Sequence, residues 1–438
     1  MPATANARST IRKRKLLLRA RAVLPVSVPP ISNGAILISG NRIAEVGCWR
    51  DLAQTERDGT IDLGDAIVLP GLVNAHCHLD YTDMAGQFPP PKIFSDWLKL
   101  ITTAKGHWSK PDYATSWING AQMLLRTGTT TVGDIEAMPD LLPEVWNLGG
   151  LRVVSFLEMI GITGRREPGE IVQEALGKID SLRAGRCCAG LSPHAPYSTL
   201  PQLLTLSANA ARQRGLRMCV HVAESSQEFE MFVHARGEMY DWLRRSTRDM
   251  SDCGLGSPVR HLLRCGVLAE NLLAVHVNHI ATGDAGLLAK RKVHVVHCPR
   301  SHEYFGHGRF PLRRLLRAGV NVCLGTDSLA SVVKTRRERV ELNMFEEMRA
   351  LANREASLSP KKILQMSTMN GARALGMATR IGELSPGSFA DLIAIPFAGK
   401  LSAIHDAVIA HKGDVCSSMI DGEWVRGKHV SQGQLAPV

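Results

Sequence analysis

The sequence lacks the long hydrophobic runs that would place it in a membrane. Its apolar stretches fall far short of the roughly 20 residues that a transmembrane helix needs. The apolar run at residues 16–18 is also too short for the hydrophobic region of a secretory signal. Hydrophobic residues make up 45% of the chain and charged residues 21%, as in ordinary globular proteins. We therefore expect a globular protein with no membrane partner.

The ten cysteines include no Cys-x-x-Cys pair, a spacing common in structural zinc sites and redox centres. Cys219, Cys298 and Cys323 lie in apolar, strand-like runs, where a free cysteine behaves as a small hydrophobic residue. The cysteine pattern therefore predicts no disulfide framework and favours a reducing, cytoplasmic location.

Acidic residues are absent from residues 1–21, which hold seven arginines and lysines. This segment accounts for seven of the net +11 charges, which leaves +4 for the rest of the chain. A basic arm can bind nucleic acid or an anionic surface. However, neither aromatic stacking residues nor a groove-reading motif follow it. We predict a solvated tail ahead of the first strand and no nucleic-acid partner.

Short apolar strands recur between residues 67 and 328, and a helical stretch follows each. They read IVLPGLVNAHCH, TTTVGDI, RVVSFLEMI, CAGLSPHAP, RMCVHVAE, LLAVHVNHI, KVHVVHCP and NVCLGTDS. Their continuous Val, Ile and Leu content is typical of parallel strands buried on both faces. Eight alternating strand–helix units predict an α/β fold, a (β/α)8 TIM barrel over residues 67–379.

Each end of the chain carries a β-hairpin signal. Gly40-Asn41 lies within residues 34–47, and Asp421-Gly422 lies within residues 417–430. We predict that residues 1–66 and 380–438 pair into a small composite β-sandwich domain, with the barrel inserted between its halves.

Histidines and one aspartate interrupt the predicted barrel strands near their C-terminal ends, where such barrels place their active sites. His76 and His78 end the first strand, His221 the fifth and Asp327 the eighth. Alternate side chains of a strand share a face, so His76 and His78 point together and Cys77 points away. Such groups are costly in apolar strands unless they are paired or bind a metal. The four residues predict a site for one divalent ion with an open coordination position, as in catalytic sites. Four separately satisfied core groups remain the alternative.

Two further residues are candidates for catalysis together with Asp327. Glu224 is too close to His221 along the chain to be an obvious fourth ligand, and it suits proton transfer from water to a leaving nitrogen. His276, in the sixth strand, is placed to hold the attacking water or to polarise the bond under attack. The alternative for Glu224 is a carboxylate at a helix start, because ESSQE reads as the beginning of a helix.

Four residues are candidate substrate contacts: His194 after the fourth strand, Trp97 in the long connection 79–128, Glu158 at the end of the third strand, and His302 after the seventh. A connection this long is typical of a lid, in which Trp97 would either cover the substrate ring or pin the loop. Glu158 could instead serve a second metal or be a satisfied strand-end carboxylate. No lysine ends a barrel strand, so we expect a mononuclear site.

The segments PGLVNAHCH, LSPHAPYS, HVAES, VHVNH, LGTDSLAS and IGELSPGSFADLIAI span nearly the whole chain. In this order and spacing they resemble the amidohydrolase superfamily, in particular its triazine-hydrolase and S-adenosylhomocysteine-deaminase branch. The resemblance implies one zinc, iron or similar ion on the three histidines and Asp327, with water activated by Glu224 and His276. It also implies that His194 contacts substrate hydroxyls. His302 stands where this branch usually has asparagine, which puts the substrate in doubt. Its neighbour His307 is expected to face solvent.

The leading functional hypothesis is a C–N hydrolase that deaminates an amino-substituted, purine- or nucleoside-like heterocycle with a metal-activated water. The alternative is hydrolysis of a cyclic amide, or of an amide or halide on a triazine-type ring, at the same site. Glu224 favours deamination because a leaving amine needs a proton. A barrel that serves only as a scaffold is a third reading, against which the intact ligand set argues. Zn²⁺ is the expected ion, with Fe²⁺ and Mn²⁺ as alternatives. The sequence does not determine the oligomeric state, and a homodimer is one of the alternatives.

Overall fold

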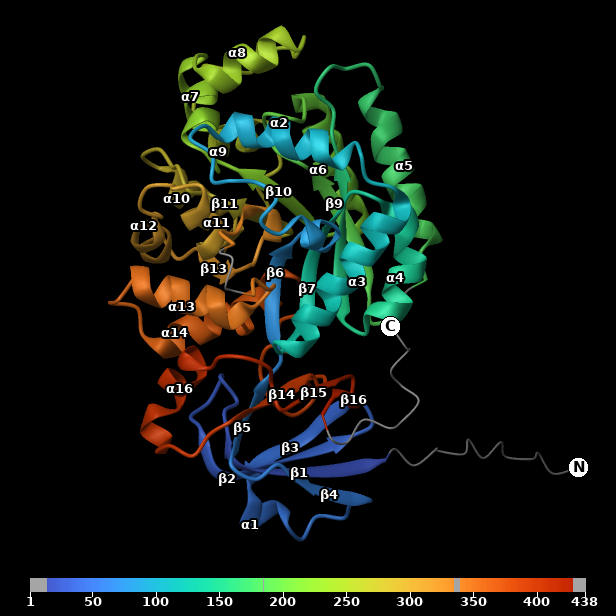
Figure 1. Cartoon of the computed structure of the whole chain (residues 1–438), viewed down its shortest axis with the longest axis vertical. Helices are drawn as coiled ribbons and strands as arrows, with labels where there is room; N and C mark the ends of the chain where they lie inside the picture. Colours follow the sequence, from blue (N-terminus) through green and yellow to red (C-terminus); the bar gives the residue numbers. More distant parts are fainter. Residues whose placement is uncertain (1–13, 184, 335–338, 428–438) are drawn as a thin grey trace, which may run out of the picture.

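Two eight-stranded sheets organise the chain. The computed structural model describes residues 14–183, 185–334 and 339–427 (Figure 1). In the figure the sheet of the terminal segments lies at one end of the molecule, and the parallel strands with their helices form the other. The predicted basic arm is described only from residue 14, and the end of the second predicted hairpin, residues 428–430, also lies outside the described residues.

The larger part is a (β/α)8 barrel, as predicted. Eight parallel strands are neighbours in chain order: β6 (Leu72–Cys77), β7 (Thr129–Glu136), β8 (Arg152–Met159), β9 (Cys188–Pro193), β10 (Met218–Val222), β11 (Leu272–His276), β12 (His294–His297) and β13 (Asn321–Leu324). The end of β13 returns to β6, where the backbone N–H of Thr326 donates to the carbonyl of His76 at 3.0 Å. A Cβ on Gly325 would lie 2.7 Å from that carbonyl oxygen, so this approach of the two strands requires glycine.

Most of the helices pack around the outside of the barrel, while α2 (Phe94–Lys105) crosses one of its ends (Figure 1). The other helices of this part are α3 (Lys110–Arg126), α4 (Leu142–Gly149), α5 (Pro168–Ser181), α6 (Pro201–Arg214), α7 (Ser226–His234), α8 (Glu238–Arg245), α9 (Pro258–Arg264), α10 (Asp284–Lys290), α11 (Pro299–Tyr304), α12 (Leu312–Arg317), α13 (Met344–Arg354), α14 (Pro360–Met366) and α15 (Met369–Ala374). Their apolar faces bury side chains such as Trp117 and Phe345 against the strands. Each such burial contributes about 1.5–3 kcal/mol. No helix among the described residues is both long and apolar enough to span a bilayer.

The terminal segments build a largely antiparallel sheet in the order β16-β15-β14-β5-β1-β2-β3, with β4 beside β1. Its strands are β1 (Lys15–Val23), β2 (Ile31–Ser39), β3 (Arg42–Cys48), β4 (Gly59–Asp62), β5 (Ala66–Pro70), β14 (Leu392–Pro396), β15 (Ser417–Ile420) and β16 (Glu423–Arg426). The helices α1 (Trp49–Leu52) and α16 (Ile404–Ala410) lie in the connections. Both predicted hairpins are present, as β2–β3 and β15–β16. The domain boundaries at 66/67 and 379/380 stay a prediction.

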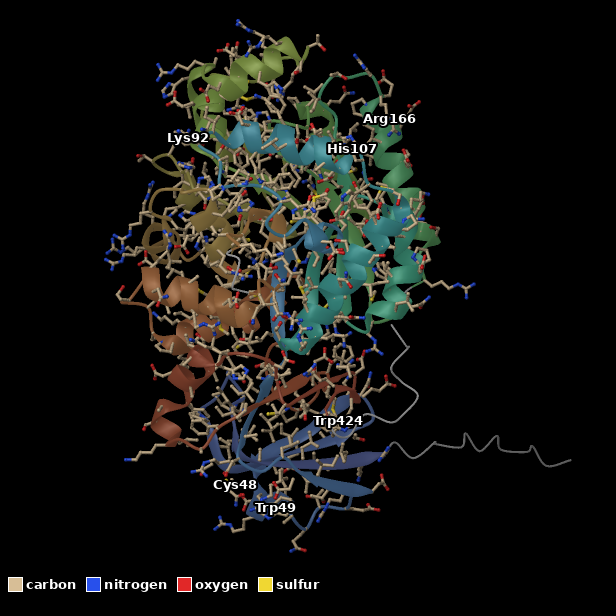
Figure 2. The ribbon with its side chains drawn as sticks, viewed as in Figure 1. Cys48, Trp49, Lys92, His107, Arg166 and Trp424 are labelled. Atoms are coloured by element: carbon tan, nitrogen blue, oxygen red, sulfur yellow. The ribbon has the colours of Figure 1, made fainter. Side chains whose placement is uncertain are left out.

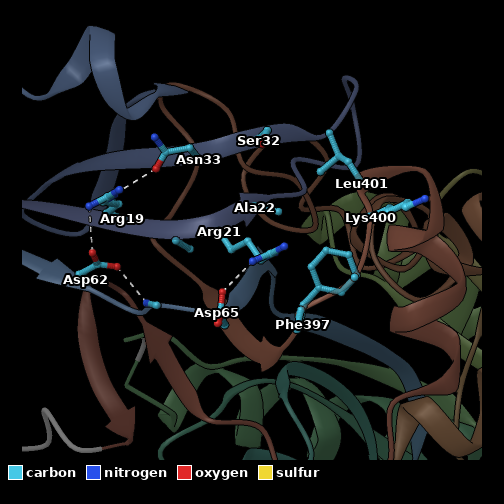
Figure 3. A pocket seen from close by; sticks show the side chains of 14 residues that line it. Arg19, Arg21, Ala22, Ser32, Asn33, Asp62, Asp65, Phe397, Lys400 and Leu401 are labelled. Carbon is cyan, nitrogen blue, oxygen red and sulfur yellow. Dashed lines mark hydrogen bonds and ion pairs between the residues drawn. The ribbon is translucent and has the colours of Figure 1, made fainter.

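The predicted solvated tail is wrong for residues 15–21, which form β1 in the middle of this sheet. Leu17 and Leu18 are buried, and the basic side chains are neutralised by acids from the neighbouring segment. Arg19 pairs with Asp62 at 3.2 Å, and Arg21 pairs with Asp65 at 2.9 Å. These pairs line an open cavity of about 830 Å³ (Figure 3). Because the charges are already paired within its wall, this cavity offers no free arginine to a ligand.

The strand predicted across residues 67–78 is in fact two strands. Residues 66–70 form β5, which pairs with β1 and β14 in the terminal sheet, and β6 begins at Leu72. The break lies at Gly71, where a Cβ would fall 2.0 Å from the hydroxyl of Thr130. The backbone therefore passes from one sheet to the other only through a residue without a side chain.

A buried ion pair ties the start of the barrel strand β8 to the terminal sheet. The Arg152 guanidinium donates to Asp391 at 3.0 and 3.2 Å and to Asp421 at 2.8 Å. It also lies over the ring of Phe389, 4.2 Å from the centroid. Arg152 and Asp391 are both buried.

We expect Arg152→Met to lower the free energy of unfolding by about 3–5 kcal/mol, because Asp391 would keep its buried charge without a cation. Denaturant unfolding of both proteins measures the difference. Arg186→Met is the matched control: Arg186 is more exposed and contacts Asp421 and Glu423 at 3.9 and 3.3 Å, so its loss should change stability by less than about 1 kcal/mol. Equal losses in the two variants would contradict the role given to burial.

Candidate metal centre

Six polar side chains meet at the C-terminal end of the barrel. They are His76, His78, His221, Glu224, His276 and Asp327. They come from or directly follow the strands β6, β10, β11 and β13, and none is more than 7% exposed. Every residue that the sequence assigned to the metal or to catalysis is thus brought to one place, although the assigned roles themselves stay predictions.

Three ring nitrogens and one carboxylate oxygen converge in this cluster. The Nε2 atoms of His78 and His221 are 3.3 Å apart. The Nε2 atoms of His76 and His78 each lie 3.7 Å from Oδ1 of Asp327. Two nitrogens that each lie about 2.05 Å from a tetrahedral zinc ion are about 3.3 Å apart. The spacing of the His78 and His221 nitrogens therefore fits a tetrahedral ion.

The hydrogen bonds around the cluster keep these atoms free for a cation. Nδ1 of His221 lies 3.0 Å from the carbonyl oxygen of His194, which can only accept, so His221 carries its proton on Nδ1 and a lone pair on Nε2. Nε2 of His76 is buried and has no hydrogen-bond partner among the described residues. A buried nitrogen without a partner is costly in an apolar barrel, and a metal ion would satisfy it.

Asp327 is oriented by three donors. Oδ2 accepts hydrogen bonds from the hydroxyls of Ser301 at 2.6 Å and Ser331 at 3.1 Å. Oδ1 accepts the backbone N–H of Ser328 at 2.8 Å and faces the histidines. The two serine hydroxyls belong to the site but were not predicted, because a serine in a short helix such as α11 or the 3-10 helix Leu329–Ser331 carries no sequence signal of such a contact.

The charge states in the cluster suit a divalent cation. Burial, followed by the charge of His76, lowers the pKa of His78 to about 3. Burial likewise lowers the pKa of His276 to about 3 and that of His221 well below its usual value. These imidazoles are therefore neutral at physiological pH, the form that binds metals. Burial alone would raise the pKa of Asp327, but its interactions with the surrounding histidines, His76 first among them, hold it well below its usual value.

Glu224 and His276 form the second half of the cluster, with Oε1 of Glu224 3.5 Å from Nε2 of His276. Burial raises the pKa of Glu224 well above its usual value, and the charges of Asp327 and Glu228 add to the effect. A carboxyl group that holds its proton at neutral pH can act as an acid. His276 has φ of +71° and Asp327 +56°, a left-handed conformation that is uncommon for non-glycine residues and that clusters at active sites.

Two residues of the NAHCHLDYT segment are left out of the cluster. Cys77 lies in the hydrophobic layer between the barrel and its helices, as the strand alternation predicts. Asp80 lies beyond the strand in a short 3-10 helix, Leu79–Met84. It is 1% exposed, and neither carboxylate oxygen has a hydrogen-bond partner among the described residues.

The helix α2 closes one side of a cavity of about 110 Å³ in front of the cluster. Figure 1 shows α2 crossing the end of the barrel that lies away from the terminal sheet, and Figure 2 labels Lys92 and His107 near its two ends. Trp97 lines the cavity and also packs edge-on against Phe305, with ring centroids 5.0 Å apart. Trp97 therefore pins the loop and is also placed to cover a substrate ring, so the two predicted roles are compatible.

The same cavity is lined by a second polar group, made of Glu158, His194 and Lys105. Nδ1 of His194 lies 2.6 Å from the hydroxyl of Ser198, which itself donates to the carbonyl of Ala195. Nδ1 of His194 therefore carries the proton and Nε2 is an acceptor. That Nε2 lies 3.9 Å from Oε1 of Glu158, while the Lys105 ammonium is 3.7 Å from Oε2. Lys105 was not predicted, because it contacts Glu158 only through the tertiary packing of α2 near β8.

The Glu158 carboxylate is charged. Burial would raise its pKa, but Lys105, and then His194, bring it below the usual value. Glu158 and the Nε2 atom of His194 are thus two hydrogen-bond acceptors that face each other across a gap. A ligand that supplies two donors would satisfy both.

His302 does not line this cavity; it lies one layer behind it. Its Nδ1 is 3.0 Å from Oδ1 of Asn278, and its Nε2 is 2.6 Å from the carbonyl of Gly308. His307, expected to face solvent, is only partly exposed and packs against Phe94 and Phe305, so that expectation is wrong. The reason is that α2 packs over this loop, a contact between segments about 200 residues apart.

Comparison with known proteins is consistent with this geometry. The model of the amidohydrolase family matches residues 67–425. A 5-methylthioadenosine/S-adenosylhomocysteine deaminase of Moorella thermoacetica is 33% identical over 396 residues, which cover 87% of this chain and 85% of the relative. An adenosine deaminase of Xanthomonas campestris, crystallised with bound zinc, is 27% identical, with a TM-score of 0.80, and the match covers 94% and 92% of the two chains. The zinc-bound atrazine chlorohydrolase of Arthrobacter aurescens is 22% identical, with a TM-score of 0.80 and coverage of 94% and 95%, a likeness of fold alone.

Proposed function

The chain belongs to the amidohydrolase family, and from that membership we propose that it hydrolytically deaminates a purine nucleoside or a derivative of one. One divalent ion, zinc by analogy with the relatives crystallised with it, would be held by His76, His78, His221 and Asp327. The substrate is a small molecule, which would enter the cavity in front of this cluster.

The observation that carries the proposal is the pair of acceptors that line the same cavity as the cluster. The vicinal hydroxyls of a ribose supply the two donors that the Glu158 carboxylate and Nε2 of His194 lack. Held there, a nucleoside extends its base toward Glu224, His276 and Asp327, which line the same cavity. The relative from Moorella is named for nucleosides that carry such a diol.

Asp327 and Glu224 each carry out one proton transfer of the reaction. A divalent ion bound at this site would lower the pKa of a water molecule and so supply the nucleophile at neutral pH. Asp327 accepts the proton that this water releases as its oxygen bonds to the amino-bearing ring carbon. Glu224, whose pKa is raised by burial, donates its proton to the amino nitrogen, so that the C–N bond breaks and ammonia leaves. His276, within 4.8 Å of both carboxylates, orients the attacking water.

The alternative, hydrolysis of a triazine-type ring or a cyclic amide, uses the same cluster. A halide leaves without a proton and would not need a protonated Glu224. A triazine also has no diol for Glu158 and His194. We therefore favour deamination. An ammonia-release screen over purines, adenosine derivatives, pterins, pyrimidines and triazines, with metal-reconstituted protein, decides between the two.

We expect Glu158→Gln to raise KM for the nucleoside substrate by about 10- to 100-fold and to leave kcat nearly unchanged, because hydrogen bonds to a charged group are lost while the reacting centre stays intact. The free base, which has no ribose, should show no such change. Glu174→Gln, at an exposed carboxylate, is the matched control. Turnover of triazines but of no nucleoside would refute the proposal, as would an equal KM for the nucleoside in all three proteins.

A further inference from the structure

Every backbone N–H and C=O group of Ala223 and Glu224 has a hydrogen-bond partner. The chain leaves β10 at Ala223, where φ is +52°, and this bend sets the direction in which Glu224 leaves the backbone. Oε1 of Glu228 accepts the N–H of Ala223 at 3.0 Å, and Oε2 accepts the N–H of Glu224 at 2.9 Å. The carbonyl of Ala223 accepts the N–H of His279 at 3.0 Å, and the carbonyl of Glu224 accepts the side-chain amide of Asn278 at 3.0 Å.

The two contacts of Glu228 are not those of an ordinary helix start. Ser225 caps α7, and its hydroxyl accepts the N–H of Glu228. In a capping box, the carboxylate three residues after the cap would return to the N–H of the cap itself. Here it reaches further back, to Ala223 and Glu224, which lie before the helix. Glu228 is fully buried, and within the described part of the chain its carboxylate accepts hydrogen bonds only from these two amides.

We propose that Glu228 is a positioning residue that aims the carboxyl group of Glu224 at the amino group of the substrate. The inference rests on the proposed function, since it acts through the acid role of Glu224. A carboxylate has two acceptor atoms and matches two adjacent N–H groups with one side chain. It thereby holds a strained left-handed residue in place, directly beside a group that must lie within hydrogen-bond reach of the leaving nitrogen.

Asn278 holds the same segment from the opposite side, through the carbonyl of Glu224, and His302 contacts Asn278 from behind. His302 therefore supports the segment around Glu224 through Asn278 and does not contact the substrate. Because the carbonyl side keeps its contacts when Glu228 is changed, loss of the carboxylate should shift the aim of Glu224 without unfolding the loop.

The test replaces Glu228 with Gln. Glutamine keeps the size, but it offers one acceptor where two are needed and turns an NH₂ group toward a backbone N–H. We expect kcat to fall about 10- to 100-fold with KM and metal content unchanged, since misplacement of a reacting group by about 1 Å has effects of this size. Glu230→Gln is the matched control, because Glu230 lies on the same helix but is exposed and paired with Arg236. Hydrogen exchange at the amides of Ala223 and Glu224 should accelerate in Glu228→Gln and not in the control.

The double variant Glu224→Gln/Glu228→Gln separates positioning from a merely structural role. If Glu228 acts through Glu224, its substitution has no further effect on kcat once Glu224 is gone. An additional loss of the same size in that background overturns the inference, and so does a Glu228→Gln enzyme as active as the Glu230→Gln control. Full activity of Glu224→Gln alone overturns the acid role in the proposed function and the inference with it. Glu228→Asp, which keeps the charge but is too short to reach both amides, should resemble Glu228→Gln.

Discussion

Asp327→Asn should leave the protein with little bound metal and almost no turnover, a fall in kcat of roughly 10⁴-fold or more. Asp327 would supply the only anionic ligand beside three histidines, and it would also accept the proton of the attacking water. Asparagine has the same shape but no charge. Its amide would also place either an NH₂ group or a neutral oxygen toward the ring nitrogens at 3.7 Å.

Metal content and kcat, measured after the same reconstitution, check this prediction. Asp284→Asn is the matched control, because Asp284 is also fully buried and accepts hydrogen bonds from Ser257 and Ala281, but lies in α10 outside the cluster. It should keep about one ion per chain. An Asp327→Asn protein with a full complement of metal would show that the three histidines suffice and that Asp327 is no ligand. Two ions per wild-type chain, one of them dependent on Glu158, would overturn the mononuclear site.

The sequence was sufficient to predict the barrel and the location of the cluster, because both depend on local patterns. Continuous apolar strands marked the eight parallel strands, and strand alternation separated His76 and His78 from Cys77. The polar residues at the strand ends then had to converge, since all parallel strands of a barrel end on one face. These inferences need no knowledge of which helix packs where.

The features that the sequence did not predict depend on contacts between distant segments. β1 was predicted to be a solvated tail because of its arginines. Their partners Asp62 and Asp65 lie some forty residues further along the chain. Lys105 enters the cavity only because α2 folds back over β8, and Ser301 reaches Asp327 from a different strand end. Side-chain pairs of this kind leave no periodic pattern in a sequence.

The role of Glu228 could be predicted from the sequence only in part. The Ser225-x-x-Glu228 spacing is a capping-box signal and could have been read from the sequence. It correctly indicates the start of α7. The departure that matters, a carboxylate turned back to Ala223 and Glu224, follows from the left-handed bend at Ala223, which no propensity predicts for alanine.

Glu224→Gln should keep its metal and still bind substrate, and should lose about 10²–10⁴ in kcat, the usual effect of removing a general acid–base group. Glutamine cannot give up a proton at neutral pH, so the amino group would have to leave unassisted. Glu224 contacts His276, at 3.5 Å, rather than the nitrogens of His76, His78 and His221, so the donor set for the ion is unchanged.

The leaving group offers the sharpest check on Glu224. In a substrate analogue that carries chloride in place of the amino group, the chloride leaves without needing a proton. Glu224→Gln should therefore slow the hydrolysis of this analogue far less than it slows deamination. Asp327→Asn should slow both alike, because both reactions need the activated water. If Glu224→Gln loses its metal along with Asp327→Asn, Glu224 is a ligand and the division of roles is wrong. If it deaminates as fast as the wild type, Glu224 serves only the turn before α7, and the acid must be sought among the other groups that line the cavity.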